Sequence, residues 1–202
     1  MIYKHYGERN SGTNFLENLL KVNFGITWTY TEWKHSIPSM KDPDSVEFII
    51  VRPLTTWLSS MYAHPYHLKR MDTFTDFLTL PQAAIDDRHD AVVDNNKTIF
   101  EIRYDKYKGM MHHFNTYGNV CLVQLDYIQN DANCAQFLHA IQQAYKFNKP
   151  VSYTTILPHT KTNSNVKNRR PKLPSKYISI INQQLSPVLE HAIETLTFKI
   201  KA

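Results

Sequence analysis

VEFIIVR, at residues 46–52, is the strongest strand signal in the sequence. Most of its residues are β-branched or aromatic, and they form one nearly continuous apolar run, which is typical of a strand buried on both faces. We therefore expect this strand to lie near the middle of a sheet.

Further strands and helices alternate on either side of this run. Short β-rich stretches predict strands at residues 2–6, 26–30 and 119–125. Apolar residues at helical spacing predict helices at 13–22, 103–117, 133–145, 175–185 and 187–196. This alternation predicts an α/β fold with a largely parallel sheet. No repeat or linker divides the sequence, so residues 1–202 are expected to form a single domain.

The composition indicates a folded, soluble protein, with 42% hydrophobic and 20% charged residues among 202. No run of about 20 apolar residues and no N-terminal signal is present, so we expect a cytoplasmic protein. Its two cysteines, Cys121 and Cys134, are expected to be reduced thiols, and no metal site is predicted. The formal charge of +5 favours an anionic partner, such as nucleic acid, an anionic surface or a phosphorylated small molecule.

A candidate anion-binding loop, GERNSGTN at residues 7–14, lies between the first predicted strand and the first predicted helix. Backbone N–H groups at such a helix N-terminus favour anions. The two glycines have the spacing of an ATPase phosphate loop, but Thr13 replaces its lysine and Asn14 replaces its magnesium-binding hydroxyl. Arg9 supplies a cation instead. The alternative is an ordinary strand-to-helix turn that is capped by Ser11 or Thr13.

A second candidate site begins where the 46–52 strand ends. Arg52 stands at the carboxyl end of that strand, where open α/β sheets bind ligands, and Pro53 is suited to open a helix. Ser60 follows about two helical turns later, so Arg52 and Ser60 can reach one phosphate, whereas Ser59 points elsewhere. The alternative is a surface arginine at a strand end and a small serine chosen for packing.

These stretches together resemble the sulfotransferase family, which transfers sulfate from 3′-phosphoadenosine 5′-phosphosulfate (PAPS). The resemblance is carried by YGERNSGTNFLENLL at 6–20, EWKHSIP at 32–38 and FIIVRPLTTWLSSMYAHPYH at 48–67, and more faintly by NVCLVQLDYI at 119–128. It implies a three-layer α/β/α fold of the P-loop NTPase type, with a central, mostly parallel sheet. It also implies PAPS as co-substrate, release of its desulfated product PAP, and no metal.

The family's motifs imply roles for particular residues of this sequence. Six consecutive residues fall on the motif that binds the 5′-phosphosulfate: Arg9, Asn10, Ser11, Gly12, Thr13 and Asn14. Arg52 and Ser60 fall on the motif that binds the 3′-phosphate. The family's C-terminal R-K-G is absent, and NVKNRR at 165–170 is the nearest candidate. There, Arg169 and Arg170 could contact PAPS, hold an acidic acceptor or belong to a solvated basic loop.

Sulfuryl transfer needs a base for the acceptor and cations for the leaving phosphate. His35 is the predicted base, because the segment Trp33-Lys34-His35 follows the predicted strand at 26–30 and should emerge beside Arg9. Lys34 and Arg9 are predicted to neutralise the developing charge. Related families sometimes use a glutamate as base, which keeps Glu8 and Glu32 as further candidates.

Two other functions remain open from the sequence. A nucleic-acid-binding module would use the positive charge and the aromatic residues, and would bind DNA or RNA in a salt-sensitive way without binding PAP. An atypical nucleotide kinase would show magnesium-dependent ATP hydrolysis. The acceptor, a hydroxylated compound or an amine, has no motif in the sequence.

Overall fold

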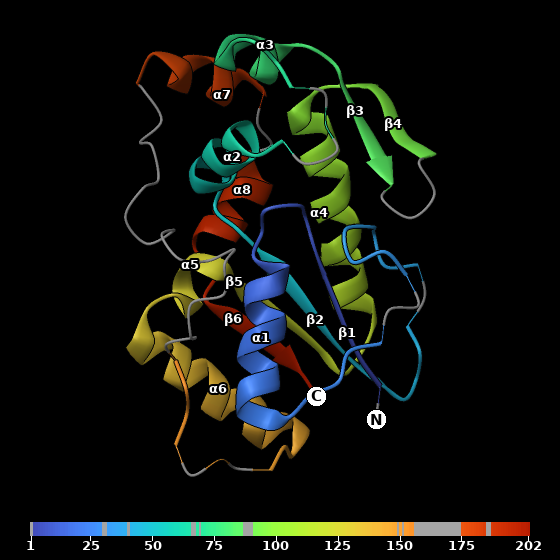
Figure 1. Ribbon diagram of the computed structural model, residues 1–202, viewed down its shortest axis with the longest axis vertical. Coiled ribbons are helices and arrows are strands. Elements are labelled where there is room, and N and C mark those ends of the chain that lie inside the picture. The colour runs from blue at the N-terminus through green and yellow to red at the C-terminus, as the bar shows by residue number, and fades with distance from the viewer. Residues whose placement is uncertain are drawn as a thin grey trace.

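The computed structural model describes residues 2–29, 32–39, 41–65, 68, 70–86, 91–148, 150, 152–155, 175–184 and 187–202. Its main sheet has the strand order β1 (Ile2–Gly7), β2 (Ser45–Val51), β5 (Val120–Gln124) and β6 (Phe198–Lys201). The first three strands are parallel and β6 is antiparallel to β5 (Figure 1). β2 is buried along its whole length and lies inside the sheet, which confirms the expected position of residues 46–52.

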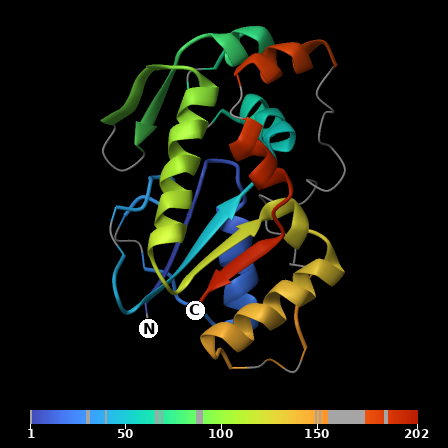
Figure 2. The same ribbon diagram turned by 180° about the vertical axis from the view of Figure 1, so that it is seen from behind.

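Helices cover both faces of this sheet. On one face lie α1 (Thr13–Phe24) and α6 (Asp131–Tyr145), and on the other lie α4 (Ile99–Thr116) and α8 (Pro187–Glu194), as the two opposite views show (Figures 1 and 2). Alternate residues of β2 point to opposite faces of the sheet. Phe48 packs in the core between the sheet and helices α1 and α6, and Ile49 packs in the core between the sheet and helices α4 and α8. The expected α/β class with a mostly parallel sheet is confirmed.

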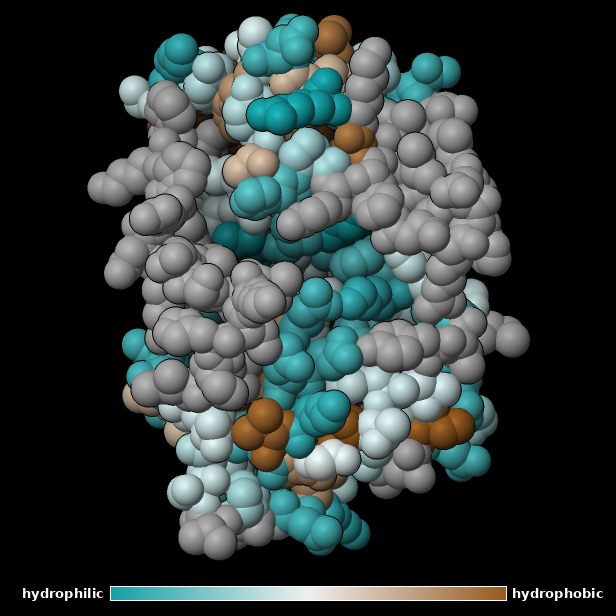
Figure 3. Space-filling model, in the orientation of Figure 1, coloured by the Kyte–Doolittle hydropathy of each residue, from teal (hydrophilic) through white to brown (hydrophobic). Residues whose placement is uncertain are grey.

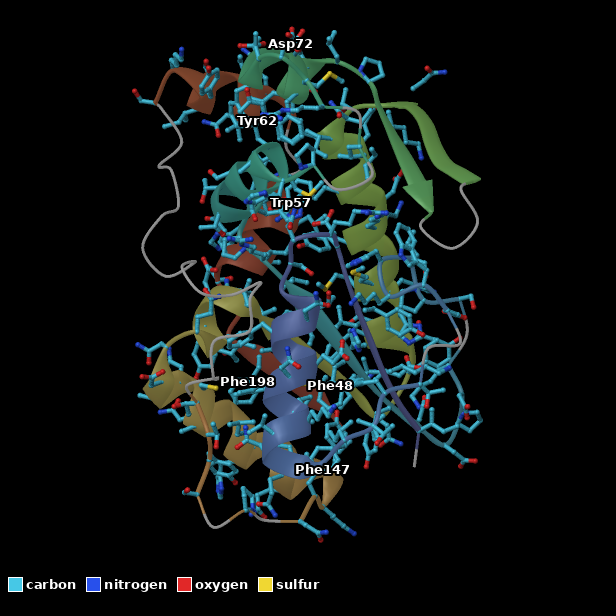
Figure 4. All side chains as sticks on the ribbon, in the orientation of Figure 1. Phe48, Trp57, Tyr62, Asp72, Phe147 and Phe198 are labelled. Carbon is cyan, nitrogen blue, oxygen red and sulfur yellow. The ribbon has the colours of Figure 1, made fainter. Side chains whose placement is uncertain are left out.

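A smaller helical layer lies beyond the carboxyl ends of the parallel strands. It contains α2 (Leu54–Ala63), α3 (Phe74–Thr79), the 3₁₀ turn η2 (Ser175–Tyr177) and α7 (Ile178–Gln184). Trp57 and Phe77 are buried in its core. Figure 4 shows Trp57 and Tyr62 in this layer, and Phe48, Phe147 and Phe198 around the sheet and α6. β3 (Gln82–Asp86) and β4 (Ala91–Lys97) form a separate antiparallel hairpin, and α5 (Leu125–Ile128) follows β5.

Most of the predicted elements are confirmed, with bounds that differ by a few residues. The predicted strand at 26–30 is wrong, because in its described part only Trp28 forms a β-bridge, to Tyr3. The helix predicted at 103–117 begins earlier, at Ile99, because Thr98 and Glu101 form a capping box at its N-terminus. The β3–β4 hairpin and β6 were not predicted. Arg169 and Arg170 lie outside the described residues.

Three chemical features of the described residues bear on function. Cys121 and Cys134 are both buried, and neither forms a disulfide. Within the described ranges, no helix combines the length and the hydropathy that crossing a bilayer requires. The same residues contain no group of three or more His, Cys, Asp or Glu side chains placed to hold a metal ion.

Candidate functional site

The loop between β1 and α1 is a tight turn that ends at the N-terminus of α1. Asn10 and Gly12 both have left-handed backbone conformations, with φ of 59° and 98°. Gly12 is the N-cap residue of α1, so no capping side chain occupies the first-turn amides there. Ser11 closes the turn, because its hydroxyl donates a 2.6 Å hydrogen bond to the carbonyl of Glu8. The amides of the turn and of the helix thus form the kind of cradle that binds anions.

Gly7 is required where this loop leaves β1. A Cβ atom at residue 7 would lie 2.7 Å from the backbone oxygen of Ile50 and would also clash with the Ser11 hydroxyl. Because Ile50 belongs to the central strand, the backbone cannot move aside. We expect Gly7→Ala to lower the free energy of unfolding by about 1–3 kcal/mol, as overpacking does.

Urea denaturation of both variants tests this expectation, with Gly118→Ala as the matched control. None of the described atoms lies within 4 Å of a Cβ at residue 118. Equal loss of stability in the two variants would contradict the role assigned to Gly7.

A cluster of cations lies beside the loop. The guanidinium carbon of Arg9 is 4.8 Å from the centre of the Trp33 ring, and Nζ of Lys106 is 5.4 Å from the same ring. Nζ of Lys34 donates a 2.5 Å hydrogen bond to Oδ1 of Asn14, in the first turn of α1. Figure 3 shows hydrophilic surface across the middle of this face, over the N-terminal end of α1. The site therefore concentrates positive charge next to the backbone cradle.

His35 is held at the end of β1 by backbone hydrogen bonds. Its Nδ1 lies 2.8 Å from the carbonyl oxygen of Gly7, and the amide of Gly7 donates to the carbonyl of Lys34 over 3.0 Å. Since a carbonyl only accepts, Nδ1 carries the ring proton and Nε2 is the basic atom. His35 thus reaches the expected place, although the predicted strand before it is absent.

Burial, together with the nearby cations Lys34, Lys106 and Arg9, lowers the pKa of His35 to about 3, against the raising effect of the hydrogen bond to Gly7. The ring is therefore neutral at pH 7. An anion bound beside the three cations offsets their repulsion, so we expect PAP to raise the pKa of His35. Nitrogen-detected NMR titration of the imidazole signals, with and without PAP, measures this shift.

The exposed ring of His112 is the internal control for that titration, because PAP should not move its signal. A His35 signal that titrates at the same pH with and without PAP would contradict the placement of an anion near His35.

The motif formed by Arg52 and Ser60 lies next to the loop at residues 7–14, at the carboxyl edge of the sheet. Nη1 of Arg52 donates a 2.7 Å hydrogen bond to the carbonyl of Asn10, and Nδ2 of Asn10 contacts Sδ of Met61 at 3.1 Å. Ser60, half-buried, precedes Met61 on α2, whereas Ser59 is buried and donates to a carbonyl of its own helix. The structure therefore brings Arg52 and the helix that carries Ser60 against the anion loop.

Trp57 joins α2 to the loop at residues 7–14. Its indole Nε1 donates a 2.8 Å hydrogen bond to the carbonyl of Arg9, and its ring is 2% exposed. Nε of Arg52 also donates to Oγ1 of Thr56, one residue earlier, over 3.3 Å. The loop at residues 7–14 and Arg52 are thus both bonded to the first turn of α2.

The two glutamates that were kept as candidate bases face other partners. The carboxylate of Glu8 is 1% exposed and accepts a 2.8 Å hydrogen bond from Nη1 of Arg103. Burial raises the pKa of Glu8 to about 7, against the lowering effect of Arg103 and Lys106. Glu32 accepts hydrogen bonds from the hydroxyl of Ser39 at 2.5 Å and from that of Tyr6 at 3.3 Å.

The predicted residues therefore fall into four groups. The structure brings together around the loop Arg9, Asn10, Gly12, Thr13, Asn14, Lys34, His35 and Arg52, and places Ser60 on α2, next to the Met61 that contacts Asn10. It uses the hydroxyl of Ser11 inside the turn, and places Glu8 and Glu32 with other partners. Arg169 and Arg170 lie outside the described residues.

Sequence reasoning missed two buried cations of α4, Arg103 and Lys106. They are 1% and 9% exposed, and they lie on the face of the helix that also buries Tyr107 and Met110. A signal was available, because a charge among apolar residues on the buried face of an amphipathic helix needs a partner inside the protein. The identity of that partner depends on the tertiary structure.

No family model, curated protein or solved structure matches this chain. A function can therefore be argued from the geometry and charge of the site, together with the resemblance of its motifs. The site offers a backbone cradle, several cations and the neutral imidazole of His35. These groups suit the binding of an anionic substrate and the removal of a proton beside it.

Proposed function

We propose that this chain is a sulfotransferase with a P-loop-like sulfotransferase fold, which moves a sulfuryl group from PAPS to an acceptor hydroxyl or amine and releases PAP without a metal ion. The observation that carries this proposal is the 2.7 Å hydrogen bond from Arg52 to the carbonyl of Asn10. It brings two sequence motifs suited to anions next to each other at one sheet edge. A nucleotide with anionic groups on both its 5′ and its 3′ oxygens matches such a pair of motifs.

The charges of the site support binding of the phosphosulfate at the loop. The backbone amides around Gly12 would receive the anionic oxygens, and Arg9 and Lys34 lie beside them. Thr13 and Asn14 stand where a magnesium-dependent loop has its lysine and its metal-binding hydroxyl. Arg9 and Lys34 would therefore neutralise the bound anion, as the lysine and Mg²⁺ do in an ATPase loop.

In the proposed reaction the acceptor oxygen attacks the sulfur in line with the leaving group. The new S–O bond uses a lone pair of the acceptor, and the S–O bond to the 5′-phosphate breaks with its electron pair staying on PAP. The acceptor proton passes to Nε2 of His35. Arg9 and Lys34 stabilise the charge that develops on the leaving phosphate.

His35 is favoured over the two glutamates as the base. Its Nε2 is the basic ring atom, whereas Glu8 is sealed behind the loop by Arg103 and Glu32 is bound to Ser39. A free-state pKa near 3 makes His35 a weak base. Bound PAPS would raise that pKa by offsetting the surrounding cations, so the base would strengthen when its substrate is present.

Transfer of labelled sulfate from PAPS, screened against panels of alcohols, phenols, sugars and amines in the presence of EDTA, tests this proposal. We expect one class of acceptor to become labelled, with PAP as an inhibitor and no loss of activity with EDTA. Magnesium-dependent release of phosphate from ATP, without sulfate transfer, would instead identify a nucleotide kinase. Salt-sensitive binding of DNA or RNA without PAP binding would identify a nucleic-acid-binding module.

A further inference from the structure

Arg103 is a fully buried cation that joins three parts of the fold. Its Nη1 donates to Oε2 of Glu8 at 2.8 Å and to the hydroxyl of Tyr107 at 3.1 Å. Its Nε and Nη2 donate to the two carboxylate oxygens of Glu190 at 2.7 and 2.9 Å. Nη2 also donates to the backbone carbonyl of Arg52 at 2.9 Å. One guanidinium of α4 thus contacts the anion loop, the end of β2 and α8.

Two of these partners belong to the two anion motifs or adjoin them in the sequence. Glu8 is the residue before Arg9 in the loop, and the carbonyl of Arg52 belongs to the residue assigned to the 3′-phosphate. The guanidinium carbon of Arg103 is also 4.7 Å from the ring of Trp57, which itself hydrogen-bonds the carbonyl of Arg9. A shift of Arg103 would therefore move both motifs relative to each other.

The electrostatics of this cluster favour a fixed, charged arginine. Burial opposes the charge on Arg103, but Tyr107, Glu8 and Glu190 together raise its pKa above the usual value. A guanidinium is planar and presents its donors in a rigid fork, whereas a lysine ammonium is one point charge on a flexible stem. A lysine at residue 103 could keep one carboxylate partner but not the full set.

We propose that Arg103 is a positioning residue that fixes the spacing between the loop at residues 7–14 and the Arg52 motif. It thereby sets the preference for a nucleotide with two anionic groups over one with a single group. This inference rests on the proposed function for the identity of that nucleotide. Arg103 acts through Glu8 and the Arg52 carbonyl, and touches no substrate itself.

The test compares Arg103→Lys with the intact protein, using PAP and adenosine 5′-phosphate, which lacks the 3′-phosphate. Calorimetry is carried out at a temperature where both proteins are folded. We expect Arg103→Lys to weaken PAP binding at least 10-fold and adenosine 5′-phosphate binding less than 3-fold. A ratio of the two dissociation constants equal to that of the intact protein would overturn the proposal.

His113→Gln is the matched control for a general loss of stability. His113 is a buried residue of the same helix, and its Nε2 lies 2.5 Å from Glu47 near the start of β2, far from the Arg52 end of that strand. We expect this variant to be less stable but to keep the ratio of the two affinities. If Arg103→Lys fails to fold, Glu190→Gln replaces it, with the same expected direction and a smaller change.

Hydrogen exchange without any nucleotide separates failure of this inference from failure of the proposed function. We expect Arg103→Lys to speed exchange of the amides at residues 8–14 and 52–57 together, while His113→Gln leaves both unchanged relative to the rest of the sheet. Unchanged exchange in both segments would overturn the positioning role. If the intact protein binds no PAP, the sulfotransferase proposal fails, and this exchange result alone decides whether Arg103 couples the two motifs.

Discussion

His35→Ala is expected to lower the rate of sulfuryl transfer by about 10²- to 10⁴-fold, the usual effect of removing a general base. The affinity for PAP should change little, because Nε2 of His35 takes a proton from the acceptor, and no acceptor is present when PAP binds alone. Steady-state rates with labelled PAPS measure the first quantity, and calorimetry with PAP measures the second. His112→Ala, in which an exposed histidine is removed, should leave both quantities unchanged.

Lys34→Ala provides the contrast to His35→Ala. Lys34 lies beside the first turn of α1, where its Nζ bonds Asn14. A cation near the leaving phosphate acts in the ground state and more strongly in the transition state, so its loss should weaken PAP binding and slow turnover together.

Full activity of His35→Ala would contradict the assignment of His35 as the base, and would return the role of base to Glu8 or Glu32.

Arg52→Ala is expected to weaken PAP binding by about 10- to 150-fold, which corresponds to losing a charge-assisted contact of roughly 1.5–3 kcal/mol. Adenosine 5′-phosphosulfate has no 3′-phosphate, so its affinity should fall far less. Calorimetry with the two nucleotides measures the difference. Arg70→Ala, which removes an exposed arginine, is the control for a general loss of positive charge. Equal weakening of the two nucleotides by Arg52→Ala would contradict the assignment of Arg52 to the 3′-phosphate.

The central elements of the fold could be predicted because their signals are local. A strand such as β2 is buried on both faces and so is almost entirely apolar, and α1 and α6 carry regular apolar faces. The segment at 26–30 has the same β-rich composition, yet its described part contributes one bridge to Tyr3. Composition predicts that a segment can be extended, but strand pairing depends on the space that the rest of the sheet leaves.

The places of the loop at residues 7–14 and of Arg52 could also be predicted, because both lie at the carboxyl ends of strands that have strong local signals. Arg103 could not, because its partners lie far away in the sequence: Glu8 is 95 residues away and Glu190 is 87. His35 reached its expected place through a backbone contact with Gly7 and not through the strand that was predicted before it. Side chains whose roles depend on such distant contacts need the tertiary structure to be recognised.

The most direct test of the proposed function is a calorimetric titration of PAP into the intact protein in the presence of EDTA. We predict binding of one PAP per chain with no divalent metal. The same binding should raise the free energy of unfolding by about 2.7 kcal/mol when PAP is present at 100 times its dissociation constant. No heat of binding and no change in melting temperature at a large excess of PAP would contradict the proposal that this chain uses PAPS.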